Sequence, residues 1–193
     1  MLTERMIIER KADLIRLLEE TDITYSMYKN AVEKYEAIVN VLKNSDIDAH
    51  IYPQGSFAIG TVVKPQRKSR NTDYDLDVIC QVSYSKSSIT ATRLYEMVKK
   101  ALENDGRYKG KLEFFEECIT IHYAEISNCS FSMDIVPSVP EDSGRILLMK
   151  GLNERKDLCD TAIAITKSNN CSLEWGTSNP EGYKNWFNEI NEK

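Results

Sequence analysis

The sequence lacks several features that would assign it to a specialised class of protein. Its five cysteines include no Cys-x-x-Cys pair and are accompanied by only two histidines, His50 and His122, so neither zinc nor a disulfide framework is indicated. No uncharged run approaches the length of a bilayer, and the chain is charged from Glu4 onward, without a signal-peptide apolar region. We therefore expect a cytoplasmic location, no membrane contact, and reduced thiols at Cys80, Cys118, Cys129, Cys159 and Cys171.

An excess of positive charge is also missing. The formal net charge is -5 and the pI is about 5.2, whereas a protein that coats long nucleic acid needs clustered cations. Small anionic substrates remain compatible with this balance, since a metal site can neutralise them locally. The one basic stretch, Lys64 to Arg70, is typical of a solvated loop, with a triphosphate or partner contact as the alternative.

What is present is an ordinary globular composition of 193 residues, 41% apolar and 28% charged, which suits one domain or one and a half. Apolar residues recur at helical spacing from Thr3 to Asn44, which predicts two helices or one helix broken near residues 21–24. Ser87 or Ser88 is expected to cap a further helix that ends at residues 104–106, and Asn179-Pro180 is a strong helix start.

Between these helices the apolar period falls to two, which is typical of strands. This alternation begins at residues 51–53, continues through residues 58–63, and is clearest from Tyr74 to Val82. It returns in residues 118–123 and 131–136. The order of helices and strands predicts an α+β fold, a mixed sheet packed by helices with a helical segment in front.

Asp75 and Asp77 stand two apart on an expected strand, so both carboxylates leave the same face and can converge on one cation. For an isolated pair of this kind, two ordinary aspartates on a solvent-facing edge are the simpler interpretation. Asp134 lies in a second apolar strand, and three carboxylates from adjacent strands suit Mg²⁺. Taken alone, Asp134 is equally compatible with a strand-end residue that bonds a turn.

Gly55-Ser56 follows the first strand-like segment, where a glycine lets backbone N–H groups approach a phosphate and a serine adds a hydroxyl donor. Most such pairs are simple turns. The combination is more specific: a Gly-Ser turn is followed about twenty residues later by an Asp-x-Asp strand and then by one aspartate in an apolar strand.

In this order, the segments QGSF, DYDLDVIC and SMDIVPSVP, supported by NPEGY, resemble the nucleotidyltransferase core of bacterial CD-NTases. These proteins, of the polymerase β superfamily, are relatives of animal cyclic GMP-AMP synthase and oligoadenylate synthetase, and they act in CBASS antiphage systems. The likeness extends from the helix at Thr24–Leu42 to Trp186-Phe187. It implies a polymerase β-like core that makes a cyclic or short linear oligonucleotide from nucleoside triphosphates.

The resemblance also implies roles for single residues. Gly55 and Ser56 would hold the donor phosphates, and Asp75 and Asp77 would bind two Mg²⁺ ions, with Mn²⁺ as an alternative. Asp134 would complete the second metal site and help to deprotonate the attacking hydroxyl. Asp73 is expected on the same face of the strand as Asp75 and Asp77. It lies outside the family's metal pair, so it would at most contact the metal ligands and would not bind the metal itself.

The chain departs from the family pattern because it ends where a helical C-terminal lobe is expected. We divide it into a helical segment (1–48), a catalytic core (49–175) and the start of a C-terminal helical region (176–193). The helix bearing Trp186 and Phe187 is expected to contact that missing lobe or a protein partner. Two other functions stay open: a transferase that modifies tRNA or protein, as some toxins do, and a non-catalytic module that binds nucleotide or a partner.

Overall fold

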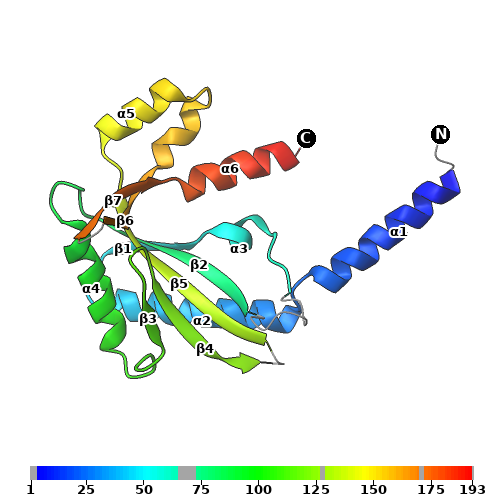
Figure 1. Cartoon of the computed structure of the whole chain (residues 1–193), viewed down its shortest axis with the longest axis horizontal. Helices are drawn as coiled ribbons and strands as arrows, with labels where there is room; N and C mark the ends of the chain where they lie inside the picture. Colours follow the sequence, from blue (N-terminus) through cyan, green and yellow to red (C-terminus); the bar gives the residue numbers. More distant parts are fainter. Residues whose placement is uncertain (1–3, 65–72, 127–128, 170–171, 193) are drawn as a thin grey trace.

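The structure, a computed structural model, describes residues 4–64, 73–126, 129–169 and 172–192. Helices pack on a mixed seven-stranded sheet (Figure 1), and the expected α+β fold class is confirmed. The predicted break in the N-terminal helical segment is confirmed as well: α1 (Glu4–Thr21) ends before α2 (Tyr25–Lys43) begins. Thr24 caps α2, because its side chain accepts a hydrogen bond from the backbone N–H of Met27.

Five strands of the sheet are ordered β1-β2-β5-β4-β3, and β6 extends the sheet by pairing with β5 and β7. The β2 and β5 strands are parallel, and the other paired strands are antiparallel. The strands are β1 (Ala49–Pro53), β2 (Asp73–Val82), β3 (Leu112–Phe114), β4 (Ile119–Ile126), β5 (Cys129–Pro140), β6 (Ile163–Asn169) and β7 (Ser172–Ser178).

The main hydrophobic core lies between one face of this sheet and helices α2 and α4 (Ala91–Glu103). Alternation along β2 directs Leu76, Val78 and Cys80 into this core, as the sequence predicts. Fully buried Ile38 of α2 and Leu94 of α4 belong to the same cluster. The core therefore fixes which face of β2 remains for the carboxylates.

Two local predictions are wrong. Residues 58–63 were expected to continue as a strand, but Gly55–Ile59 form the short helix α3, which ends at Gly60 in a left-handed conformation. The cap of α4 is Thr90 rather than Ser87 or Ser88, because the Thr90 side chain accepts the hydrogen bond from the N–H of Arg93. The Ser88 hydroxyl instead closes a turn by donating to the carbonyl of Ser85.

The C-terminal third contains elements that have little periodic pattern in the sequence: α5 (Ser143–Leu152), a 3₁₀ helix η1 (Lys156–Thr161), and the strands β6 and β7. The predicted helix start at Asn179-Pro180 is confirmed in α6 (Pro180–Asn191), where Asn179 accepts from the N–H of Gly182. The division of the chain at residues 48/49 and 175/176 stays a prediction.

Three helices leave apolar side chains uncovered. In Figure 1, α1 extends away from the sheet, while α5 and α6 lie on the side of the molecule away from α2. These helices carry exposed large apolar residues: Ile8, Leu14, Ile15, Leu17, Leu18, Leu147, Leu148, Leu152, Tyr183, Trp186 and Ile190. The apolar side expected for α6 is thus present and partly open to solvent.

Among the described residues, no helix is long and apolar enough to span a bilayer. Cys80, Cys118, Cys129 and Cys159 are free thiols, as expected, and Cys171 lies outside the described residues.

Candidate metal and nucleotide site

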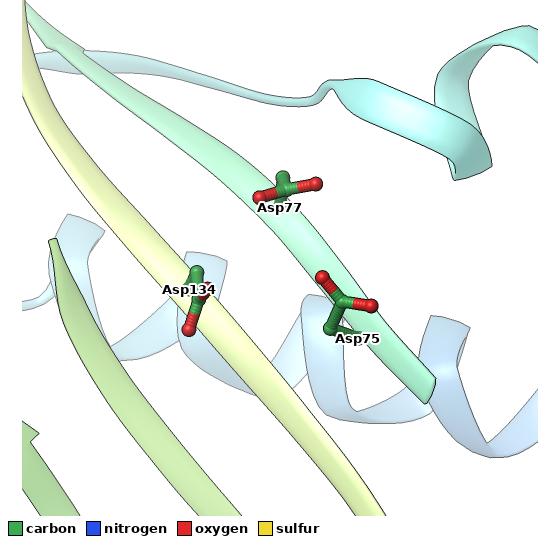
Figure 2. Close-up of side chains that lie close together, drawn as sticks. All are labelled: Asp75, Asp77 and Asp134. Atoms are coloured by element: carbon green, nitrogen blue, oxygen red, sulfur yellow. The ribbon is translucent and has the colours of Figure 1, made fainter. Parts of the chain in front are cut away.

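Strands β2 and β5 place the three predicted acids on one face of the sheet. The two strands run parallel, and their register aligns Asp77 with Asp134 and Asp75 with Ser132. Because side chains of neighbouring strands at the same register share a face, Asp75, Asp77 and Asp134 all project away from the helical core. Figure 2 shows their carboxylates lying together above these two strands.

The carboxylates are close enough to share a cation. One oxygen atom from each of Asp75, Asp77 and Asp134 can be chosen so that all three lie within 4.8 Å of one another. Asp75 is exposed, whereas Asp77 and Asp134 are partly buried. An all-oxygen, triply negative set of ligands fits a hard divalent cation such as Mg²⁺ or Mn²⁺.

The three carboxylates also repel one another, and a bound cation would relieve this repulsion. Burial raises the pKa of Asp77 from 3.8 to about 6, and the charges of Asp75 and Asp134 act in the same direction. Three carboxylates at this spacing repel one another when all are ionised. A bound cation would remove this repulsion, which is the usual reason for such a cluster on a partly buried face.

Helix α3 begins directly against this cluster. Gly55 has a φ of +61°, and a Cβ atom built on it would collide with Oδ2 of Asp77. The backbone N–H of Gln54 also donates to the carbonyl oxygen of Asp77 at 2.8 Å. Gly55 therefore lies beside Asp77, and Ser56 follows in the first turn of α3.

Strand β4 contributes Thr120 to this region, and the residue directly before the strand contributes Cys118. The Thr120 hydroxyl donates a hydrogen bond of 2.6 Å to Oδ1 of Asp134, and Sγ of Cys118 lies 3.8 Å from the Thr120 oxygen. Burial, followed by the charge of Asp134, raises the pKa of the Cys118 thiol to about 11. The alternation of residues 118–123 puts Cys118 and Thr120 on one face, but the sequence does not show that this face meets Asp134.

Two predicted features fall largely outside the described residues. The side chain of Asp73 is not described, although its backbone begins β2. Of the basic stretch, only Lys64 is described; it donates to the carbonyl of Glu19 in α1, and the rest lies outside the described residues.

Comparison with known proteins finds a family model that matches part of the chain. Residues 49–136, which contain Gly55, Ser56 and all three aspartates, match the family described as Cyclic GMP-AMP synthase DncV-like, nucleotidyltransferase domain. A curated relative named c-di-GMP synthase, from Roseivirga ehrenbergii, is 26% identical over 182 residues, covering 92% of this chain and 42% of the relative.

Solved structures of CD-NTases share the fold. The Bradyrhizobium diazoefficiens CD-NTase CdnG in complex with GTP matches with a TM-score of 0.63 and 22% identity, over 86% of this chain and 43% of that one. The Vibrio cholerae di-nucleotide cyclase DncV matches with a TM-score of 0.60 and 13% identity, over 90% and 59%. The chain thus spans about half the length of the proteins that it matches.

Proposed function

We propose, from the match of residues 49–136 to the DncV-like nucleotidyltransferase family, that this chain is the catalytic lobe of an enzyme that joins nucleoside triphosphates into a cyclic dinucleotide. The observation that carries the proposal is the cluster of Asp75, Asp77 and Asp134 on adjacent strands. The name of the curated relative, c-di-GMP synthase, supports a cyclic dinucleotide product. By the resemblance to the CD-NTases of CBASS systems, the product would be an antiviral defence signal.

In this proposal Asp75, Asp77 and Asp134 hold divalent cations, Mg²⁺ in the first place. Bound there, the cations would activate the attacking ribose hydroxyl and stabilise the leaving pyrophosphate. Asp77 reaches from the middle of β2 toward Asp134 of β5, so it would contribute to both ions. Asp134 would stand beside the hydroxyl of the acceptor nucleotide and draw away its proton.

Gly55 and Ser56 would hold the triphosphate of the donor nucleotide. The support is geometric: the start of α3 touches Oδ2 of Asp77, so phosphate oxygens at Gly55 would lie beside a cation held by the aspartates. The missing Cβ lets the backbone at Gly55 approach the Asp77 carboxylate closely, and the Ser56 hydroxyl would add a donor for a phosphate oxygen.

The remaining length of the relatives would supply the rest of the active site. The open apolar faces of α1, α5 and α6 are suitable contacts for a second, helical lobe, present either in a longer chain or in a partner protein. We propose that Trp186 and Ile190 of α6 lie in this contact. The choice of base would then depend on both lobes.

The test is incubation of the chain with the four ribonucleoside triphosphates and Mg²⁺, followed by mass spectrometry of the products. Metal-dependent GTP binding is measured in parallel by calorimetry. We expect metal-dependent GTP binding by the wild type alone, and a cyclic dinucleotide with pyrophosphate once the second lobe is supplied. The variant with Asp75→Ala and Asp77→Ala should lose both the product and the metal-dependent part of GTP binding.

A matched control removes two carboxylates elsewhere. Glu33→Ala with Glu36→Ala takes the same charge from the exposed surface of α2, on the opposite side of the sheet, and should leave product and binding unchanged. Product formation or metal-dependent binding that survives the loss of Asp75 and Asp77 would refute the site. Transfer of nucleotide onto RNA or protein would favour the alternative transferase.

A further inference from the structure

Thr120 of β4 makes a contact with the metal site that neither the motif nor the family match assigns. The register of β4 against β5 places Thr120 opposite Asp134, and its residue surface is only 5% exposed. Its hydroxyl donates to Oδ1 of Asp134 at 2.6 Å. This length lies in the range of hydrogen bonds from a hydroxyl to an ionised carboxylate, which are roughly twice as strong as neutral ones.

The direction of this hydrogen bond is fixed by the chemistry of the two groups. An ionised carboxylate can only accept, so the single hydroxyl hydrogen of Thr120 is used on Asp134. Cys118, whose sulfur lies 3.8 Å from the Thr120 oxygen, can then act only as a donor to that oxygen. The hydroxyl is therefore held from both sides, and it has no freedom to serve another acceptor.

The bond restricts how Asp134 can meet a cation. It occupies Oδ1 on the β4 side of the strand and leaves Oδ2 without a hydrogen bond among the described residues. The side chain of threonine has restricted rotation about χ1. The backbone around Thr120 is held as well, because the residues directly before and after it pair with β5. A flexible carboxylate would have to adopt this orientation each time a cation binds, whereas here the orientation exists in advance.

We propose that Thr120 is a positioning residue, which holds the Asp134 carboxylate in the orientation that binds a divalent cation. This inference rests on the proposed function, because it assumes that Asp134 is a metal ligand. Groups that orient metal ligands in this way typically change metal affinity by about 10- to 100-fold when they are removed. A purely structural role for Thr120 would change the folding of the chain and leave metal affinity untouched.

The experiment measures Mn²⁺ binding to the chain without nucleotide, from the electron paramagnetic resonance signal of free Mn²⁺. Thr120→Val keeps the shape of the side chain and removes the donor, while Thr120→Ser keeps the donor. We expect Thr120→Val to weaken Mn²⁺ binding by about 10-fold or more. Thr120→Ser should keep most of the affinity, and metal-dependent GTP binding by Thr120→Val should recover at high Mn²⁺ concentration.

The matched control is Thr166→Val. Thr166 is another buried threonine, but its hydroxyl donates to the backbone carbonyl of Glu117 at 3.4 Å and not to a carboxylate. Thr166→Val should bind Mn²⁺ as the wild type does, and circular dichroism checks that each variant is folded. Wild-type affinity in a folded Thr120→Val, or an equal loss in Thr166→Val, would overturn the positioning role.

The variant Asp134→Asn distinguishes a failure of the proposed metal site from a failure of the positioning role of Thr120. If the wild type binds Mn²⁺ and Asp134→Asn abolishes the binding, the metal site stands and the Thr120 variants decide the inference alone. If the wild type and Asp134→Asn do not differ, Asp134 is not a ligand, and the proposed function and the role of Thr120 are refuted together.

Discussion

The Asp77 carboxylate is partly buried beside Asp75 and Asp134, and its pKa is raised to about 6. A carboxylate whose pKa is higher in the folded state than in the unfolded chain favours folding only while it is protonated. Its contribution is complete below about pH 4 and is lost as the pH rises through about 6. At neutral pH without a cation, the ionised Asp77 therefore destabilises the fold.

This gives a prediction for Asp77→Asn, which keeps the shape of the side chain and cannot ionise. At pH 7 in EDTA, the variant should be more stable than the wild type by about 1 to 2 kcal/mol, a value reduced for partial solvent exposure. That change corresponds to a rise of a few degrees in the midpoint of thermal unfolding. The measurement is thermal unfolding followed by circular dichroism at pH 7 and pH 4.

The difference between the two proteins should shrink to nearly zero at pH 4, because Asp77 is then protonated in the wild type. Carboxylates outside the cluster titrate alike in both proteins and cancel. Added Mg²⁺ should raise the midpoint of the wild type and not that of Asp77→Asn. An Asp77→Asn variant that is no more stable at pH 7 would show that the cluster does not carry this electrostatic penalty.

The cluster of Asp75, Asp77 and Asp134 could be predicted from the sequence. The alternation of the strand shows which residues share a face, and the order of the motifs is visible in the residues themselves. The sequence did not predict Thr120. The bond from Thr120 to Asp134 depends on the register between β4 and β5, which is set by the packing of two strands and leaves no local pattern.

Among the elements, the helix α3 shows where pattern reading fails. Residues 58–63 alternate as a strand would, but α3 occupies Gly55–Ile59. Gly55 and Gly60 both have positive φ angles, so they allow the chain to turn sharply at either end of α3. Five residues are too few to show a helical period, and the close approach of Gly55 to Asp77 leaves no pattern in the local sequence.

The two glycines provide a matched pair of variants. Gly55→Ala places a methyl group against Oδ2 of Asp77, whereas Gly60→Ala meets nothing within 4 Å. Both variants carry the strain of a positive φ, about 1 kcal/mol each. Only Gly55→Ala should displace Asp77, so we expect it to weaken Mn²⁺ and GTP binding at least 10-fold, a loss typical of a displaced ligand.

Calorimetry of Mn²⁺ and GTP binding to both alanine variants checks this expectation, with unfolding in urea as a measure of their stability. Gly60→Ala should bind like the wild type despite a similar loss of stability. Equal binding by both variants would mean that the contact between α3 and Asp77 does not shape the site.

The strands β6 and β7 were also missed from the sequence. Buried residues of β6, such as Ile163 and Ala164, are followed by polar ones, so no alternation runs the length of the strand. The strand exists because β5 and β7 pair with it on either side. Long-range pairing of this kind overrides a weak local preference.

In the molecule as a whole, the apolar side chains that form the core and those that are exposed to solvent lie on different elements. The core between the sheet and helices α2 and α4 is closed, whereas α5 contains no buried residue. Leu148 and Leu152 of α5 are 62% and 87% exposed, and Leu102 of α4 is 0% exposed. The apolar side chains of α5 therefore contribute little to the folding of this chain, which fits the proposal that a second lobe covers them.

The last prediction compares these two kinds of leucine. Leu148→Gln with Leu152→Gln should change the free energy of unfolding by no more than about 0.5 kcal/mol, because both side chains already contact water. Leu102→Ala should lower it by about 2 to 5 kcal/mol, because it opens a cavity in the closed core. Unfolding in urea followed by circular dichroism measures both changes. A loss above about 2 kcal/mol in the glutamine variant would mean that α5 packs into the chain's own core, which would remove α5 from the surface available to a second lobe.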